Sequence, residues 1–197
     1  KTNQVLKRGL ADVQYRPLEA PEPLAQKLFQ AYFPLVEALK AQQPITDILK
    51  AFDQYRVLCA LREGNYGVFS INQRLSVLLQ RALLLPEDSS NVWFHGRPVM
   101  VTQNDYTLGV FNGDIGFIRR IEHASQFLEI NFGDRSIRFH FDELDRLSLA
   151  YAISIHKSQV PILHESYSPP YPKDYLLGQE TNTRLIDFLQ CLFQTTP

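Results

Sequence analysis

The segment RVLCALREGNYGVFSIN, residues 56–72, carries the pattern that decides the fold. Its first six residues, 56–61, are almost all apolar, as in a strand that is covered on both faces. Gly64 and Gly67 then indicate a turn, and apolar residues recur at helical spacing from Ile71 onward. A strand, a glycine turn and a helix form the unit of a parallel sheet, so we expect an α/β domain.

The residues before this segment predict two further helices. Apolar residues recur at helical spacing over residues 24–39, where Pro34 is expected to end or kink the helix. A second amphipathic helix is expected over residues 45–52. Residues 24–91 therefore supply helices and the first part of the α/β domain. We interpret residues 1–23, which are mixed in character and carry prolines near their end, as a tether.

A change of composition after residue 91 predicts a small β-structure inserted into the α/β domain. Residues 92–145 are rich in β-forming residues and are interrupted by glycines. Apolar and polar residues alternate over 128–132 and again over 137–141, on either side of the turn at Gly133. This pattern is typical of a β-hairpin with one buried face. We interpret residues 92–145 as a small twisted β-barrel.

A second apolar run, residues 149–155, predicts another buried parallel strand within a returning segment of residues 146–159. Polar residues 156–159 follow the carboxyl end of this strand, which is where ligands bind in open parallel sheets. Residues 160–197 contain a proline-rich stretch at 168–172 and one expected short helix, and we interpret them as a linker and a divergent tail.

Composition limits the classes of function. The chain has 197 residues and a formal net charge of −1, which argues against coating nucleic acid by bulk electrostatics but allows a local DNA groove. The two cysteines form no motif with metal spacing. The sequence contains no signal peptide, and no apolar run approaches the roughly 20 residues that span a bilayer. We therefore expect a cytoplasmic protein without membrane partners.

Three segments, in order, resemble the RecD family, the alpha subunit of exodeoxyribonuclease V and a superfamily 1 DNA helicase. Residues 56–72 look like helicase motif IV in its RecD form, residues 96–116 match a second family segment, and residues 154–159 resemble the start of motif V. The resemblance covers residues 40–159. It implies the C-terminal half of the motor: a RecA-like parallel-sheet domain, the second helicase domain, with an inserted small SH3-like β-barrel.

The resemblance also implies roles for individual residues. The second motor domain of this family supplies an arginine that senses the γ-phosphate of ATP, and Arg62 is our candidate for this catalytic, nucleotide-binding role. A guanidinium suits the role because its planar, permanently charged fork binds phosphate oxygens in pairs. The polar strand end is expected to contact DNA. The DNA-binding candidates are Ser154, His156, Lys157, Ser158 and, as a weaker hypothesis, Asn104.

Simpler interpretations of these residues remain open. Arg62 is equally typical of a surface arginine that caps a strand end or pairs with Glu63. His156, taken alone, is an ordinary loop histidine. Asn104 and the Asn112-Gly113-Asp114 cluster are typical of tight turns.

Two departures from the family limit the expected activity. No Gly-x-x-x-x-Gly-Lys-Ser/Thr phosphate loop and no suitable magnesium carboxylate pair occur in the sequence, so we expect a fragment that starts after the first motor domain. After Gln159 the family pattern stops, and no arginine-bearing motif VI follows. ATP and magnesium are therefore expected to act in the full-length protein and not to bind tightly to this fragment, which we expect to be inactive alone.

In its full context, the resemblance implies ATP-dependent unwinding of DNA during double-strand-break repair. The implied partners are single-stranded DNA, duplex ends, and the beta and gamma subunits of exodeoxyribonuclease V. The alternative is a non-catalytic module, derived from a helicase, that binds protein or single-stranded DNA.

Overall fold

The computed structural model describes residues 18–85, 93–122 and 126–155. The tail and linker expected over residues 160–197, and the first 17 residues of the expected tether, lie outside this part. The described helices are α2 (Pro21–Gln30), α3 (Phe33–Lys40), α4 (Ile45–Asp53), α5 (Val68–Ala82) and the short 3-10 helix η1 (Phe141–Arg146). The strands are β1 (Val57–Cys59), β2 (Pro98–Val101), β3 (Ile115–Glu122), β4 (Phe127–Asn131), β5 (Ser136–His140), β6 (Leu147–Leu149) and β7 (Ala152–Ser154).

The apolar pattern of residues 24–39 forms two helices, with the expected break near Pro34. Pro34 lies in the first turn of α3, where its missing N–H would have had no helical partner. For the same reason α2 begins at Pro21, so the proline-bearing end of the expected tether is helical. The helices expected around residues 45–52 and after Gly67 are confirmed as α4 and α5.

Five strands form an antiparallel sheet in the order β5-β4-β3-β2-β6. The predicted hairpin is confirmed, with Leu128 opposite Phe139 and Ile130 opposite Ile137, all four buried. Side chains from all five strands share one core, as in a small barrel. Strand β6 also pairs with β2, so this sheet extends beyond the expected boundary at residue 145.

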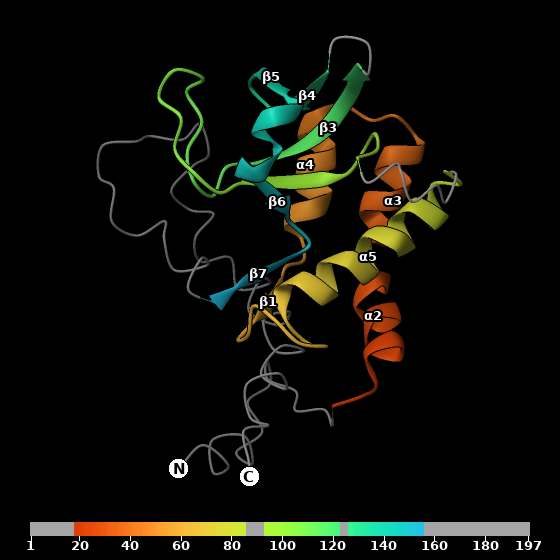
Figure 1. Cartoon of the computed structure of the whole chain (residues 1–197). Coiled ribbons are helices and arrows are strands. Elements are labelled where there is room, and N and C mark those ends of the chain that lie inside the picture. Colours follow the sequence, from red (N-terminus) through yellow and green to blue (C-terminus); the bar gives the residue numbers. More distant parts are fainter. Residues whose placement is uncertain (1–17, 86–92, 123–125, 156–197) are drawn as a thin grey trace, which may run out of the picture.

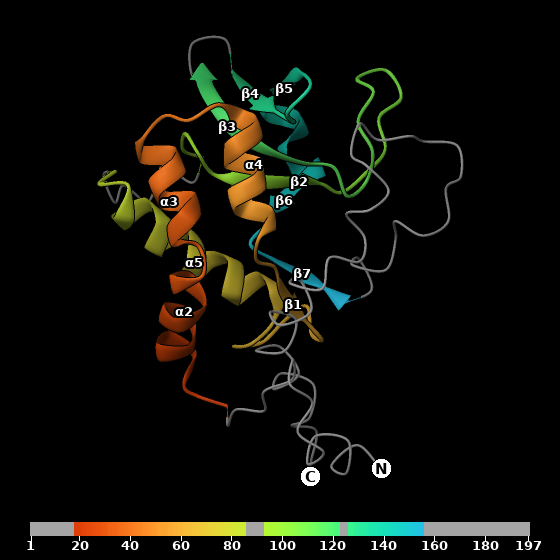
Figure 2. The ribbon, with the colours of Figure 1, turned by 180° about the vertical axis from the view of Figure 1, so that it is seen from behind.

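Strands β2 and β3 separate this core from a second one beneath the helices, and Figures 1 and 2 show α4 against them. Met100 and Phe117 belong to the helical core, whereas their neighbours Val99 and Ile118 belong to the core of the sheet. The rings of Phe117 and Phe52 on α4 meet edge to face, with centroids 5.4 Å apart. Successive side chains of β2 and β3 point to opposite faces of the sheet, so these two strands contribute to both cores and join the two halves of the molecule.

The apolar run of residues 149–155 does not form the single strand that its sequence predicts. Leu149 ends β6 in the antiparallel sheet, and Ala152 begins β7, which pairs in parallel with β1. Ala150 and Tyr151, at 0% exposure, carry the chain from one sheet to the other through the core. Leu149, the crossing residues and the start of β7 are all buried or half-buried, so the run stays apolar where the chain passes from one sheet to the other.

The structure confirms a mixed α/β protein with a small parallel sheet made by β1 and β7. The hydroxyl of Tyr32, which lies between α2 and α3, donates a hydrogen bond to the Tyr151 carbonyl at 2.6 Å. This bond fixes the start of β7 against the helices. Because the Tyr32 hydroxyl is buried there, its pKa is raised well above its ordinary value.

Candidate functional site

The two strands of the parallel sheet end at the same edge, because Cys59 lies opposite Ser154 in a parallel register. Ser154 is the last residue of β7 and is half-buried, and Arg62 follows the end of β1 by three residues. Figure 1 shows β1 and β7 side by side, so Ser154 lies at the carboxyl end of one of these strands and Arg62 lies three residues beyond the end of the other. Three further predicted contacts lie outside the described residues: His156, Lys157 and Ser158.

Arg62 lies on a turn of residues 60–67, called here the Arg62 turn, that leads from β1 into α5. The first turn of α5 closes it, since Phe69 N–H donates to the Arg62 carbonyl at 3.2 Å. Gly67 is packed so tightly that a Cβ atom would lie 2.4 Å from the Glu63 carbonyl oxygen. The glycine that predicted the turn is therefore required by its shape.

The Arg62 side chain is exposed. Within the described part of the chain its guanidinium forms no hydrogen bond or ion pair, either with Glu63 or with any other residue. The simpler interpretation of Arg62 as half of an ion pair with Glu63 is therefore not supported. An exposed guanidinium on a closed turn is able to bind an anion that approaches this edge of the sheet.

The outer side of β7 is paired by a side chain instead of a strand. Asn72 of α5 is buried; its Oδ1 accepts from Ala152 N at 2.8 Å and its Nδ2 donates to Ala152 O at 2.8 Å. Nδ2 also lies 3.3 Å from the Leu149 carbonyl oxygen. Sequence reasoning missed this contact, and its signal was an amide next to Ile71 on the apolar side of α5.

Asn104 lies elsewhere, on the loop between β2 and β3, and the structure does not bring it to the edge that holds Arg62. Its Oδ1 accepts a hydrogen bond from Asn112 N at 2.8 Å. This contact between residues eight positions apart closes the loop, as expected for a turn-forming asparagine. The hydrogen bond of the Asn104 side-chain oxygen therefore agrees with the interpretation of Asn104 as a turn-forming residue.

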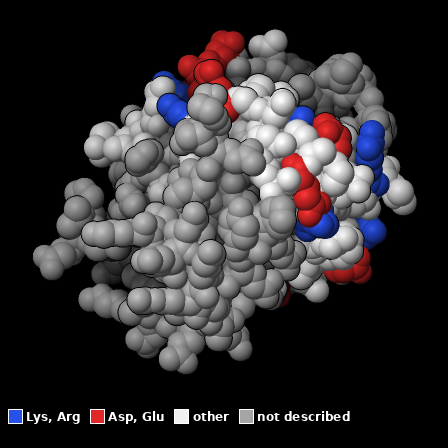
Figure 3. Space-filling view, turned by 90° about the horizontal axis from the view of Figure 1, so that it is seen from below, with Lys and Arg blue, Asp and Glu red and all other residues white. Residues whose placement is uncertain are grey.

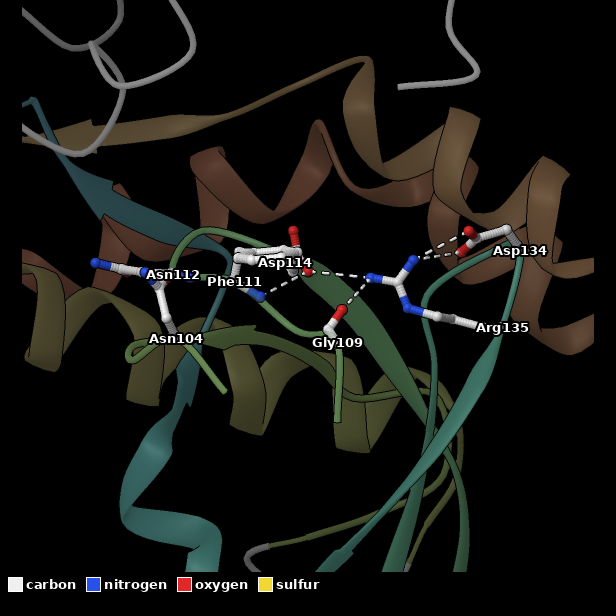
Figure 4. A network of polar contacts seen from close by, with 7 residues as sticks. All are labelled: Asn104, Gly109, Phe111, Asn112, Asp114, Asp134 and Arg135. Atoms are coloured by element: carbon white, nitrogen blue, oxygen red, sulfur yellow. Dashed lines mark hydrogen bonds and ion pairs between the residues drawn. The ribbon is translucent and has the colours of Figure 1, made fainter. Parts of the chain in front are cut away.

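Figure 4 shows how the same loop, residues 102–114, is fastened to the β4–β5 hairpin. Arg135 donates through Nη2 to the Gly109 carbonyl at 3.1 Å and to Asp114 Oδ2 at 3.3 Å. Asp114 Oδ2 also accepts from Phe111 N at 3.0 Å. One arginine of the hairpin turn thus holds a carboxylate and a carbonyl group of the loop.

A second carboxylate, Asp105, fixes the tip of this loop. Its Oδ1 accepts from Thr107 N at 2.9 Å and from Leu108 N at 3.0 Å, while Oδ2 pairs with Arg146 Nη1 at 2.7 Å. These bonds, that of Leu108 N–H foremost, hold the pKa of Asp105 below its ordinary value. Tyr106 stands at the tip with 80% of its surface exposed.

Arg97 has a structural position between the two cores. It is 6% exposed, and burial lowers its pKa. Its guanidinium lies against the rings of Trp93 and Phe94, with its Cζ atom 5.5 Å and 5.4 Å from the ring centroids. This buried arginine is therefore not a surface contact for phosphate.

One face of the molecule carries charges of both signs. On the face in Figure 3, acidic and basic side chains of the described residues are interspersed. No group of three histidine, cysteine, aspartate or glutamate side chains within residues 18–85, 93–122 and 126–155 has a metal-binding arrangement. Among the helices that the structure describes, none is long and apolar enough to cross a membrane.

Residues 71–132 match the family model of the ATP-dependent RecD-like DNA helicase SH3 domain. RecBCD enzyme subunit RecD of Haemophilus influenzae is 32% identical over 108 residues, which are 55% of this chain and 16% of that protein. The Mycobacterium tuberculosis subunit is 34% identical over 119 residues, 56% of this chain and 19% of that protein. A region of this chain is homologous to RecD-like DNA helicases. The resemblance seen in the sequence is thereby confirmed.

The ATP-dependent RecD2 DNA helicase of Deinococcus radiodurans is 27% identical over 139 residues, 66% of this chain and 19% of that protein. The RecD-like region thus spans less than a fifth of the length of these curated relatives. The family match begins within α5 and includes strands β2, β3 and β4 of the antiparallel sheet.

Among solved structures, the chain is similar to Bacteroides Pif1 helicase in complex with ADP-AlF3 and ssDNA, with 17% identity and a TM-score of 0.39 over 81% of this chain and 47% of that one. Bacteroides Pif1 bound to ssDNA gives 18% identity and a TM-score of 0.34 over 74% and 41%. These scores are too low to establish a shared overall fold.

Proposed function

We propose that this chain is part of the second, RecA-like motor domain of an ATP-dependent DNA helicase. The observation that supports the proposal is the common edge of the parallel sheet, where Ser154 ends β7 and Arg62 follows the end of the adjacent strand β1 by three residues. Ligands of parallel sheets bind beyond the carboxyl ends of the strands. Homology to RecD-like helicases supports the same conclusion.

Arg62 is the nucleotide-facing residue of this proposal. Its exposed guanidinium, which has no partner within the described residues, fits a γ-phosphate supplied from outside the chain. In the full-length protein, ATP bound with magnesium would supply the phosphoryl group whose transfer drives movement. The phosphate loop and the magnesium carboxylates would come from the first motor domain. Arg62 would stabilise the charge that develops on the transferred group.

Ser154 and the residues that follow it form the DNA-facing part. A serine hydroxyl and the polar side chains of His156, Lys157 and Ser158 suit hydrogen bonds to a phosphate backbone, because such contacts need short donors and one positive charge. We assign no base-specific role to them. Asn104 remains a weaker DNA-binding candidate, since its carbonyl oxygen already closes a loop.

The relatives extend the proposal to partners. RecD is named as a subunit of the RecBCD enzyme. We infer that the full-length protein assembles with the beta and gamma subunits of exodeoxyribonuclease V. It would unwind duplex ends during double-strand-break repair in the cytoplasm.

Reconstitution tests the proposal. This chain would be mixed with a separately expressed first motor domain that carries the phosphate loop, and ATP turnover would be measured with and without single-stranded DNA. Restored, DNA-stimulated turnover is expected, with each half alone as the control. Binding of DNA or protein without any restored turnover would favour the non-catalytic module instead.

A further inference from the structure

The Arg62 turn is fastened to the beginning of the described chain by two side chains that the sequence did not single out. The hydroxyl of Tyr66, within the turn, donates a hydrogen bond to the Glu19 carbonyl at 3.0 Å. Arg74, on α5, donates through Nε and Nη2 to Glu22 Oε1 at 3.3 Å and 3.2 Å. Both bridges link the turn or its helix to residues 19–22, more than forty positions away.

Arg74 also contacts the turn itself. Its Nη1 lies 3.4 Å from the carbonyl oxygens of Asn65 and Ser70, and its side chain is 26% exposed. One guanidinium therefore joins α2, the turn and α5. These bonds are long, and the Glu22 side chain is 69% exposed, so each bond of Arg74 is weak. The shorter, partly buried bond of Tyr66 is the stronger of the two bridges.

Arg62 itself has no partner within the described residues that would hold its side chain. The backbone of the turn therefore fixes only the point from which the Arg62 side chain extends. We propose that Tyr66 and Arg74 are positioning residues, which hold the Arg62 turn against residues 19–22 and so place Arg62 for its anion. This inference rests on the proposed function, in which that anion is the γ-phosphate of ATP.

The test is a pair of substitutions in the complete helicase subunit, with steady-state ATP turnover as the readout. Tyr66→Phe removes only the hydroxyl. It is expected to lower kcat about threefold to tenfold with KM changed less than about twofold, because a misplaced transition-state contact affects kcat. Tyr106→Phe removes a hydroxyl from an exposed tyrosine on the distant loop and is expected to leave kcat unchanged.

The same substitution in an Arg62→Ala background separates positioning from a general structural effect. If Tyr66 acts through Arg62, Tyr66→Phe lowers kcat no further once the guanidinium is gone. An equal loss in both backgrounds overturns the inference. The inference is also overturned if Tyr66→Phe leaves kcat unchanged while Arg62→Ala strongly lowers it.

Failure of the proposed function gives a different result. If Arg62→Ala itself leaves ATP turnover unchanged, the role of Arg62 is wrong, and the positioning role falls with it. Should Tyr66→Phe fail to fold, Arg74→Lys provides the same test. A lysine keeps the charge but cannot reach Glu22 and Asn65 together, so a fall in kcat of about twofold is expected, again absent in the Arg62→Ala background.

Discussion

Asn72 pairs with the backbone of Ala152 as a neighbouring strand would, through one bond to the N–H and one to the C=O, both of 2.8 Å. Val57 N donates to the Tyr151 carbonyl on the other side, so the N–H and C=O of Ala152 point away from β1. The amide on α5 therefore completes the buried edge of β7. It also locks the helix that follows the Arg62 turn to the strand that carries Ser154.

Removing this amide should destabilise the whole domain. Asn72→Leu keeps the branched shape of the side chain but leaves a buried N–H and a buried C=O without partners, which is expected to lower the free energy of unfolding by about 2–4 kcal/mol. Urea unfolding followed by circular dichroism measures the change. Gln73→Ala, at the exposed neighbouring position, should change the same quantity by less than about 0.5 kcal/mol. Equal effects from the two variants would show that Asn72 does not complete the edge.

The lowered pKa of Asp105 leads us to expect that the stability of the fold depends on pH in the acidic range. Its folded-state pKa lies below the ordinary value of 3.8, so its contribution to stability is present above that pH and is lost as the pH falls through the folded-state pKa. Asp105→Asn keeps an oxygen acceptor but has no charge to titrate. The difference in Tm between wild type and variant should be largest near neutral pH and should shrink below about pH 4. A difference that stays constant from pH 7 to pH 2 would contradict this assignment.

We expect the bonds of Arg135 to make the loop that carries Tyr106 more rigid. Arg135→Ala removes the donor to Gly109 and Asp114, so amide exchange in residues 105–111 should become about fivefold faster, as expected for losing roughly 1 kcal/mol of local stabilisation. Hydrogen–deuterium exchange with peptide resolution measures it. Arg138→Ala, on the neighbouring strand β5, is the control and should leave these amides unchanged. The same acceleration in both variants would mean that Arg135 does not clamp the loop.

The sequence predicted those parts of the fold that depend on neighbouring residues. The strand, turn and helix of residues 56–72 were found correctly because each has a local pattern: a short apolar run, paired glycines, then helical spacing. The hairpin was found for the same reason, since alternation on both sides of Gly133 fixes its buried face. The parallel pairing of β1 with β7 was expected from two buried runs and is confirmed.

The remaining features depend on contacts between distant residues. The run of residues 149–155 was predicted as one strand, because apolar composition does not show where a buried chain passes from one sheet to another. Tyr66, Arg74 and Asn72 were missed as contacts because their partners lie between 47 and 80 positions away. The sequence predicted that Arg62 follows β1 on a glycine turn, but not the bonds that hold this turn.

The most direct measurement compares Arg62→Ala with Lys157→Ala in the complete subunit, recording ATP turnover and single-stranded DNA binding at several salt concentrations. Arg62→Ala is expected to lower turnover by about two orders of magnitude or more, with DNA affinity changed less than about threefold. Lys157→Ala is expected mainly to weaken DNA binding and to reduce its salt dependence by about one phosphate contact. Equal and negligible effects of both substitutions on both quantities would contradict the assignment of one sheet edge to nucleotide and DNA.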